Sequence, residues 1–148
     1  MDLDRRALNT EENAEKAFRT AGDALAALTA GKVWTHTSPH GEPEIKGALL
    51  HDGKPAVILH FSTEDGNILP RGLHSYSQAS PELVSQVKES LAEYSSKLTV
   101  LEGAEFREPE FCWALPVAYK GRIVAHIKVS AQGDGIVPDK KAQEEMSR

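Results

Sequence analysis

The feature that most constrains the fold of this chain is a pattern that is written twice. The tripeptide EPE begins at Glu42 and again at Glu108, and an Ala-Leu pair follows each copy at the same offset of 66 residues. Upstream, at that same offset, two apolar stripes with the spacing of a helix coincide. They are Ala17, Ala21, Leu25 and Leu28 in the first copy and Leu83, Val87, Leu91 and Tyr94 in the second.

The similarity continues downstream of EPE after a small insertion. Two extra residues in the second copy change the offset to 68, which aligns Gly53 with Gly121 and "ILP" from Ile68 with "IVP" from Ile136. An insertion of two residues preserves the direction in which strand side chains point. Two unrelated helix-and-hairpin units can share turn glycines and apolar stripes, but the doubled EPE and the terminal proline favour an internal duplication.

Each copy is predicted to be a helix followed by three strands. The first helix is expected from about Asn9 to a C-terminal cap at Gly31, with Glu12 completing a capping box. The second is expected from Ser80 as N-cap, with Pro81 in its first turn, to about Lys97. Strands are expected at 32–37, 44–50, 55–62, 98–101, 110–119 and 122–130.

These elements predict a single α+β domain over residues 1–148. Its units would span about 9–70 and 80–138, and a short tail helix capped by Asp139 would occupy 139–148. Helices that precede antiparallel hairpins favour a mainly antiparallel sheet with two helices packed on one face.

The turns at Asp52-Gly53 and Lys120-Gly121 fix which strand residues share a face. The face expected under the helices carries Ala48, Leu50, Val57, Leu59 and Phe61, with Cys112, Ala114, Pro116, Ile123, Ala125, Ile127 and Val129. The opposite face carries Ile45, Leu49, His51, Ala56, Ile58 and His60, with Phe111, Trp113, Leu115, Val117, Tyr119, Arg122, Val124, His126 and Lys128. Pro116 in mid-strand indicates an edge strand or a bulge.

The opposite face is too apolar for water, so a cover is expected. A second copy in a homodimer, a small molecule in a groove, or the sheet curling onto itself would each provide one. The loop "RGLHSYSQA" from Arg71 has no counterpart in the second copy. It is either a longer connection that only crosses the end of the sheet or a place for specific function. The predicted ligand-binding residues are therefore His60, Arg71, His74, Tyr76, Phe111, Trp113, Tyr119, His126 and Lys128.

The leading functional hypothesis is a binding or sensor module with a small-molecule pocket on this second face. The aromatic residues would form its apolar wall, and the histidines, Arg71 and Lys128 would recognise polar or anionic groups. One alternative is an acid/base enzyme that uses His60, His126 or His74 in the same pocket. The other is a homodimeric structural protein. No catalytic residue or cofactor is assigned.

Other chemistry in the sequence is less specific. As a pair, His60 and His126 could ligate haem iron or a metal, but the predicted strands of that face carry no carboxylate to orient either ring. His36 and His40 have the H-x3-H spacing of a helical metal site, but Pro39, Gly41 and Pro43 forbid a helix there. No metal site is predicted. The glutamates of the doubled EPE could flank a substrate or hold a cation, but we expect them to be solvated.

The composition excludes several classes of protein. A formal charge of −5 with scattered Lys and Arg argues against binding to nucleic acid or anionic lipid. The single cysteine rules out an internal disulfide. The N-terminal residues lack the apolar stretch of a signal peptide, and no segment approaches the roughly 20 apolar residues of a membrane span. These features predict a soluble cytoplasmic protein.

Overall fold

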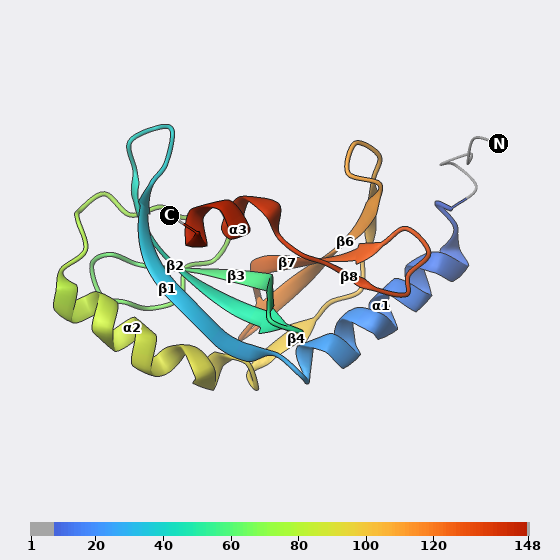
Figure 1. Ribbon diagram of the computed structural model, residues 1–148, viewed down its shortest axis with the longest axis horizontal. Coiled ribbons are helices and arrows are strands. Elements are labelled where there is room, and N and C mark those ends of the chain that lie inside the picture. The colour runs from blue at the N-terminus through green and yellow to red at the C-terminus, as the bar shows by residue number, and fades with distance from the viewer. Residues whose placement is uncertain (1–7, 148) are drawn as a thin grey trace.

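A computed structural model describes residues 8–147 of the chain (Figure 1). The fold is α+β, with three helices and antiparallel sheets among the described residues, as the sequence predicts. The helices are α1 (Glu11–Leu25), α2 (Pro81–Tyr94) and α3 (Lys140–Met146). The strands are β1 (Thr29–Thr37), β2 (Pro43–His51), β3 (Lys54–Phe61), β4 (Leu98–Val100), β5 (Glu105–Arg107), β6 (Cys112–Tyr119), β7 (Arg122–Ser130) and β8 (Ile136–Val137).

The helix starts follow local signals more closely than the helix ends. The Ser80 side chain caps α2 by accepting from the backbone N–H of Leu83, and Asp139 caps α3, both as predicted. In α1 the cap is Thr10, which accepts from Asn13, one residue after the expected start. The predicted C-cap at Gly31 is wrong, because Gly31 lies within β1. A side chain there would approach Leu50 Cδ2 to 2.8 Å, so this glycine permits close contact with β2.

The strands form two antiparallel sheets. One has the order β1-β2-β3, and the other has the order β4-β6-β7-β8 with β5 also paired to β6. Of the two alternatives predicted from Pro116, the edge strand is wrong, since β6 is central, whereas the pairing of β6 with β7 does shift register next to this proline, between Val117 and Ala118. Pro116 lies where the partner of β6 changes from β5 to β4, so neither strand pairs with it. A proline is tolerated at this gap because no ladder hydrogen bond from its backbone nitrogen is needed there.

The β2–β3 hairpin and the β6–β7 hairpin each carry a bulge near the turn. Because of these bulges, the strand faces differ from the predicted ones. The turns pair His51 with Lys54 and Tyr119 with Arg122 as expected. Beyond them, Ala56 and Val124 are extra residues, so that Leu49 pairs with Val57 and Val117 pairs with Ala125. One extra residue reverses the facing of everything beyond it relative to the opposite strand. The predicted grouping of β2 with β3, and of β6 with β7, is therefore wrong by one residue.

The corrected pairing gathers large apolar side chains on one face of each hairpin. These side chains form a continuous core that is exposed by less than one-tenth: Ile45, Leu49, Val57, Leu59 and Phe61, with Trp113, Leu115, Val117, Ala125, Ile127 and Val129. Helix α2 packs on β1 and β2, and α1 packs on β4, β6 and β7, so each helix contacts the sheet of the other half of the chain. Helix α3 lies on the other side of the strands in Figure 1.

The two sheets meet where β3 and β7 lie next to each other (Figure 1). We call this junction the seam. It has no strand ladder, but two backbone hydrogen bonds fasten segments across it. The N–H of Arg71 donates to the carbonyl of Ile123, and the N–H of Asp139 donates to the carbonyl of Pro55. The residues that follow β3 and β8 are therefore fixed over the seam.

Candidate functional site

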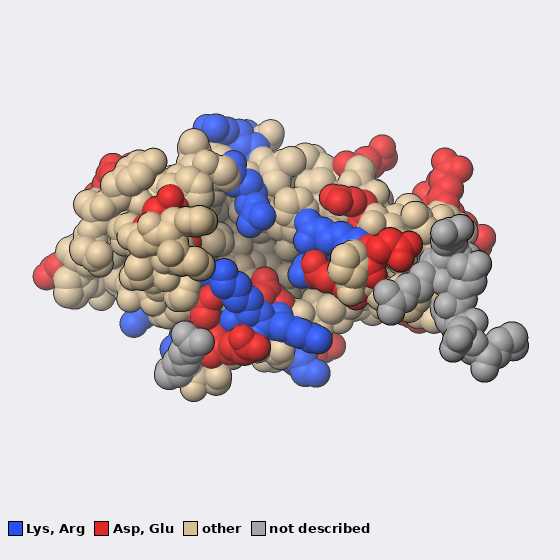
Figure 2. Space-filling view, turned by 90° about the horizontal axis from the view of Figure 1, so that it is seen from above, with Lys and Arg blue, Asp and Glu red and all other residues tan. Residues whose placement is uncertain are grey.

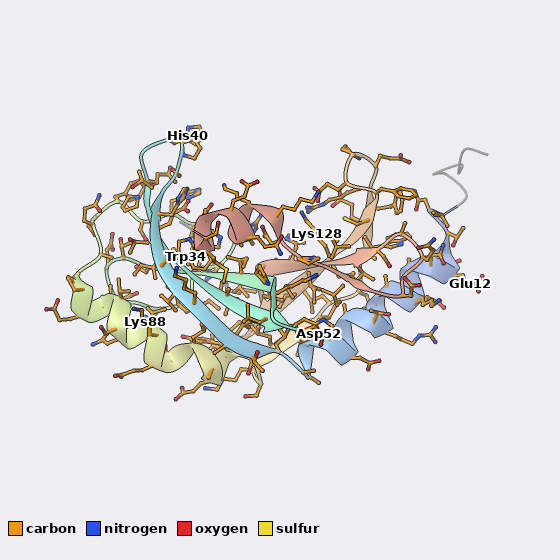
Figure 3. All side chains as sticks on the ribbon, viewed as in Figure 1. Glu12, Trp34, His40, Asp52, Lys88 and Lys128 are labelled. Atoms are coloured by element: carbon orange, nitrogen blue, oxygen red, sulfur yellow. The ribbon has the colours of Figure 1, made fainter. Side chains whose placement is uncertain are left out.

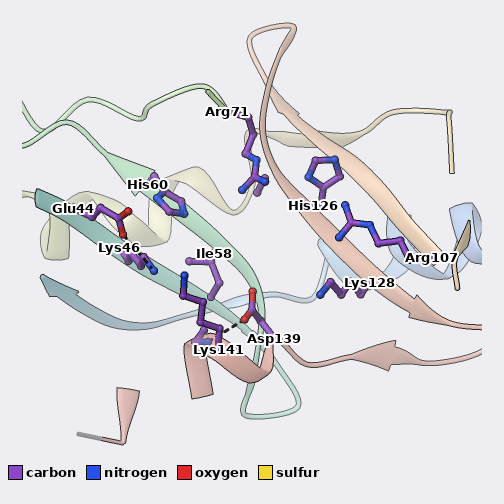
Figure 4. Close-up of a pocket in the computed structure, with 12 residues that line it drawn as sticks. Glu44, Lys46, Ile58, His60, Arg71, Arg107, His126, Lys128, Asp139 and Lys141 are labelled. Carbon is purple, nitrogen blue, oxygen red and sulfur yellow. Dashed lines mark hydrogen bonds and ion pairs between the residues drawn. The ribbon is translucent and has the colours of Figure 1, made fainter. Parts of the chain in front are cut away.

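A cleft of about 240 Å³ opens over the seam, on the side away from α1 and α2. In Figure 2 it is the hollow near the centre of the surface, with Lys and Arg around its rim. Its walls come from β2, β3, β5, β7, α3 and the loop after β3. The lining residues are Glu44, Lys46, Ile58, His60, Arg71, Arg107, Ala125, His126, Lys128, Asp139, Lys141 and Ala142 (Figure 4).

The seam strands supply the floor of this cleft. Ile58 and His60 alternate with the core residues Val57, Leu59 and Phe61 along β3, and they therefore point away from the core. On β7 the same alternation, set by the bulge, directs His126 and Lys128 to the cleft. The bulges thus separate an apolar face from a polar one.

The five cations of the cleft differ in how their charge is balanced. Lys46, only 5% exposed, lies 3.0 and 3.2 Å from the two oxygens of Glu145 and 3.4 Å from Glu44. Lys128 and Arg107 both pair with Glu110 at the rim. Arg71 and Lys141, in contrast, have no carboxylate within ion-pair distance anywhere in residues 8–147. Arg71 reaches between His60 and His126 in Figure 4.

Both histidines of the cleft are held in their neutral form at neutral pH. Burial lowers the pKa of His60 from its ordinary 6.5 to about 4, and the charges of Lys46 and Arg71 act in the same direction against Glu44 and Glu145. Burial also lowers the pKa of His126, with Arg71 as the leading charge contribution. The imidazoles therefore offer neutral hydrogen-bonding groups beside cationic side chains.

Helix α3 forms one wall and is anchored by a buried carboxylate. Glu145 accepts hydrogen bonds from Trp34 Nε1 at 2.9 Å and from Lys46, and His36 Nδ1 lies 3.8 Å away. Figure 3 shows Trp34 beside α3. Burial by itself would raise the pKa of Glu145, but the hydrogen bonds from Trp34 and Lys46 outweigh it and lower the pKa. The carboxylate thus fixes α3 against β1 and β2.

The structure brings together four of the predicted site residues. His60, Arg71, His126 and Lys128 all line the cleft. The predicted aromatic wall lies elsewhere. Trp113 is 3% exposed in the core and donates to the carbonyl of Ala131, while Tyr119 packs edge-on against Tyr94 of α2. Phe111 packs with Phe106 near the β5–β6 turn. The bulge accounts for Trp113, because it places this residue and its strand neighbours under the helices.

The remaining predicted residues lie in the loop after β3 but not in the cleft. The imidazole of His74 is 2.9 Å from the carboxylate of Glu42 and lies at a neighbouring hollow together with Arg71 and His60. Tyr76 is 80% exposed, and it is not among the residues that line the cleft. The loop is held from below by Ser75, whose hydroxyl accepts from the N–H of Thr63. These contacts hold the loop whose first residue, Arg71, extends over the seam.

Sequence reasoning missed most of the charged lining. Glu44 was expected to be solvated as part of EPE, but its side chain is only one-fifth exposed and faces the cleft. Arg107 comes from β5, an unpredicted three-residue strand. Lys141 belongs to the predicted tail helix, but no local signal tells where that helix packs. The doubled EPE was the available clue, since Glu44 and Glu110 are its third residues and both pair with cleft lysines.

Several other features of the described residues bear on function. Within residues 8–147, no group of three or more His, Cys, Asp and Glu side chains is arranged to hold a metal ion. None of the helices in that range is long and apolar enough to cross a membrane. Comparison with protein-family models, with curated proteins and with solved structures found no match. The chemistry of the cleft is therefore the guide to function.

Proposed function

We propose that this protein is a small-molecule binding module that holds a small anion, a carboxylate or a phosphate, in the cleft over the seam. The observation that carries the proposal is the position of Arg71. Its guanidinium enters the cleft between two histidines and has no carboxylate partner within residues 8–147. A cation left unbalanced in a chain of net charge −5 is suited to an anionic ligand.

The size and the polarity of the cleft agree with a small ligand. Water occupies about 30 Å³ per molecule, so a cleft of this volume holds on the order of eight waters. A metabolite with roughly that number of non-hydrogen atoms replaces them. The neutral imidazoles of His60 and His126 orient such a ligand without adding positive charge, and Ile58 gives it limited apolar contact.

The doubled sequence pattern gives the site a second source of support. We propose that the two halves descend from one helix-plus-three-strand unit. Both hairpins have residues with positive φ in the turn and an extra residue at the same place, Ala56 and Val124. His60 and Lys128 occupy corresponding positions at the offset of 68, and each half contributes one EPE glutamate beside the cleft. A duplicated unit would form a shared site at its junction.

Acid/base catalysis is a second candidate, favoured by the displaced pKa of His60 in a cleft. A pKa of about 4 suits neither role well at neutral pH, because the acid form is scarce and the base is weak. Ligand binding therefore comes first. A homodimer stays a prediction. It was expected to cover an exposed apolar face of the sheet, but most of those apolar side chains lie in the core.

The test is an anion titration of the native protein followed through the histidine ring resonances by NMR. The probes are inorganic phosphate, succinate, glutarate and L-glutamate. We expect saturable binding of at least one probe and an upward shift of the pKa of His60, because a bound anion favours the imidazolium form. The absence of saturable binding for all four probes contradicts the proposal.

A matched pair of arginine variants locates the binding. Arg71→Gln should weaken the affinity about tenfold or more, because it removes a charge-assisted contact. Arg122→Gln changes an exposed arginine at the β6–β7 turn and should alter the affinity by less than about twofold. Equal effects of the two substitutions would show a diffuse attraction of anions and not a site.

A further inference from the structure

Glu44 is a carboxylate whose hydrogen-bonding capacity is not used by the described chain. Its Oε2 is buried and accepts no hydrogen bond in residues 8–147. Its nearest charge is Lys46 Nζ at 3.4 Å, but that ammonium group already donates to both oxygens of Glu145 at 3.0 and 3.2 Å. A buried acceptor without a donor is costly, so a donor from elsewhere would be favoured here.

This carboxylate and the unbalanced Arg71 border the same space. Both line the cleft, and both also line the neighbouring hollow next to the loop after β3, in each case together with His60. In Figure 4 the carboxylate of Glu44 points toward His60 from one side and Arg71 approaches from the other. The two opposite charges do not pair with each other. The neutral imidazole of His60 lies between them.

A ligand complementary to this arrangement carries one group of each charge. An ammonium group on Glu44 and a carboxylate on Arg71 would give both residues the partners that they lack, and the fork of the guanidinium suits a carboxylate. Lys141, the second cation without a carboxylate partner, lines another wall and would favour a further negative charge on the ligand. Inorganic anions and simple dicarboxylates satisfy only the positive part of the site.

We infer that the ligand is a small α-amino acid, with an acidic side chain preferred, whose ammonium group donates to Glu44 while its α-carboxylate binds Arg71. The inference rests on the proposed function, since it names the class of anion that the same cleft takes. A ligand of this kind has about the number of non-hydrogen atoms that the cleft accommodates.

Two pairs of ligands test the inference by the sign of a difference. L-glutamate and glutarate, like L-aspartate and succinate, differ only in the amino group, and its loss makes the ligand more negative. A site that responds to negative charge alone binds the dicarboxylates more tightly. If the ammonium group of the ligand donates to Glu44, calorimetry of the native protein should show that the amino acid of at least one pair binds about tenfold more tightly than the matching dicarboxylate.

Variants of the two glutamates in the first EPE provide the matched comparison. Glu44→Gln should weaken the binding of L-glutamate at least tenfold and leave the affinity for glutarate unchanged or increased. Glu42→Gln alters the glutamate that pairs with His74 at the loop and should preserve the preference for the amino acid. If Glu44→Gln fails to fold, the comparison of ligands on the native protein decides the question.

The outcomes separate this inference from the proposed function. Tighter binding of the dicarboxylates, or an unchanged preference in Glu44→Gln, overturns the amino-acid assignment and leaves anion binding in place. Failure of phosphate and of all four organic ligands to bind overturns both. A preference for the amino acids that Glu44→Gln removes and Glu42→Gln does not supports both.

Discussion

The two sides of the seam strands carry side chains of opposite character. On one side, Val57 and Leu59 of β3 and Ile127 and Val129 of β7 are fully buried in the core. On the other side, the residues alternating with them face a cleft crowded with charge. The same strands therefore supply both the core and the candidate site, and the composition of that site depends on which side chains the pleat directs away from the helices.

The largest expected effect compares neighbouring residues on β3. Leu59→Ala should lower the free energy of unfolding by about 2–5 kcal/mol, because it leaves a cavity in a fully buried core. Ile58→Ala truncates a partly exposed side chain that lines the cleft, and should cost about 1 kcal/mol. Chemical denaturation of both variants measures the difference. A larger cost for Ile58→Ala would break the distinction between the two sides.

The next effect is the dependence of stability on pH that His60 imposes. Its pKa is about 4 in the folded protein and 6.5 ordinarily, so the unfolded chain takes up the proton first as the pH falls. Stability is therefore unaffected above pH 6.5 and is lost between pH 6.5 and 4, by up to roughly 3 kcal/mol at about 1.36 kcal/mol per pKa unit.

A histidine pair isolates this contribution from the other titrating groups. In His60→Gln, the slope of unfolding free energy against pH should flatten over that window. His40→Gln replaces an exposed histidine at the tip of the β1–β2 hairpin (Figure 3) and should leave the slope unchanged. Identical slopes in all three proteins would show that His60 is not buried as described.

A smaller effect concerns the helix that walls the charged side. Glu145→Gln removes the charge that balances buried Lys46 and should lower the free energy of unfolding by about 2 kcal/mol, because Glu44 remains as a partial partner. Glu144→Gln changes an exposed neighbour on α3 and should cost less than about 0.5 kcal/mol. Because the folded pKa of Glu145 is lowered, the difference should disappear as the pH falls through that pKa.

Much of the secondary structure could be predicted because its signals are local. Ser80 and Asp139 cap helices where the sequence indicates, and the turns at Gly53 and Gly121 pair the flanking residues as expected. The helix end predicted at Gly31 fails for a non-local reason, since this glycine serves the contact with Leu50 on the next strand. Short strands such as β5 are equally invisible, because three residues carry no periodicity.

Four polar residues of the candidate site were predicted, but the rest of its charged lining was missed and the predicted aromatic residues lie elsewhere. His60, Arg71, His126 and Lys128 reach the cleft, whereas Trp113 lies in the core. The cause is one extra residue in each hairpin, Ala56 in β3 and Val124 in β7. No residue type near either position indicates a bulge. A prediction that assumes strict alternation ignores these bulges, and it therefore groups each strand with the wrong face of its partner.

The sequence by itself determined the α+β composition, the β2–β3 and β6–β7 hairpin turns, and the N-caps at Ser80 and Asp139, because turns, caps and apolar periodicity act over a few residues. Only the tertiary structure decided which strand faces the helices cover, that Arg71 extends across the seam, and that Glu145 fixes α3 beside the cleft. Those outcomes depend on contacts between residues far apart in the chain, and local preferences do not specify them.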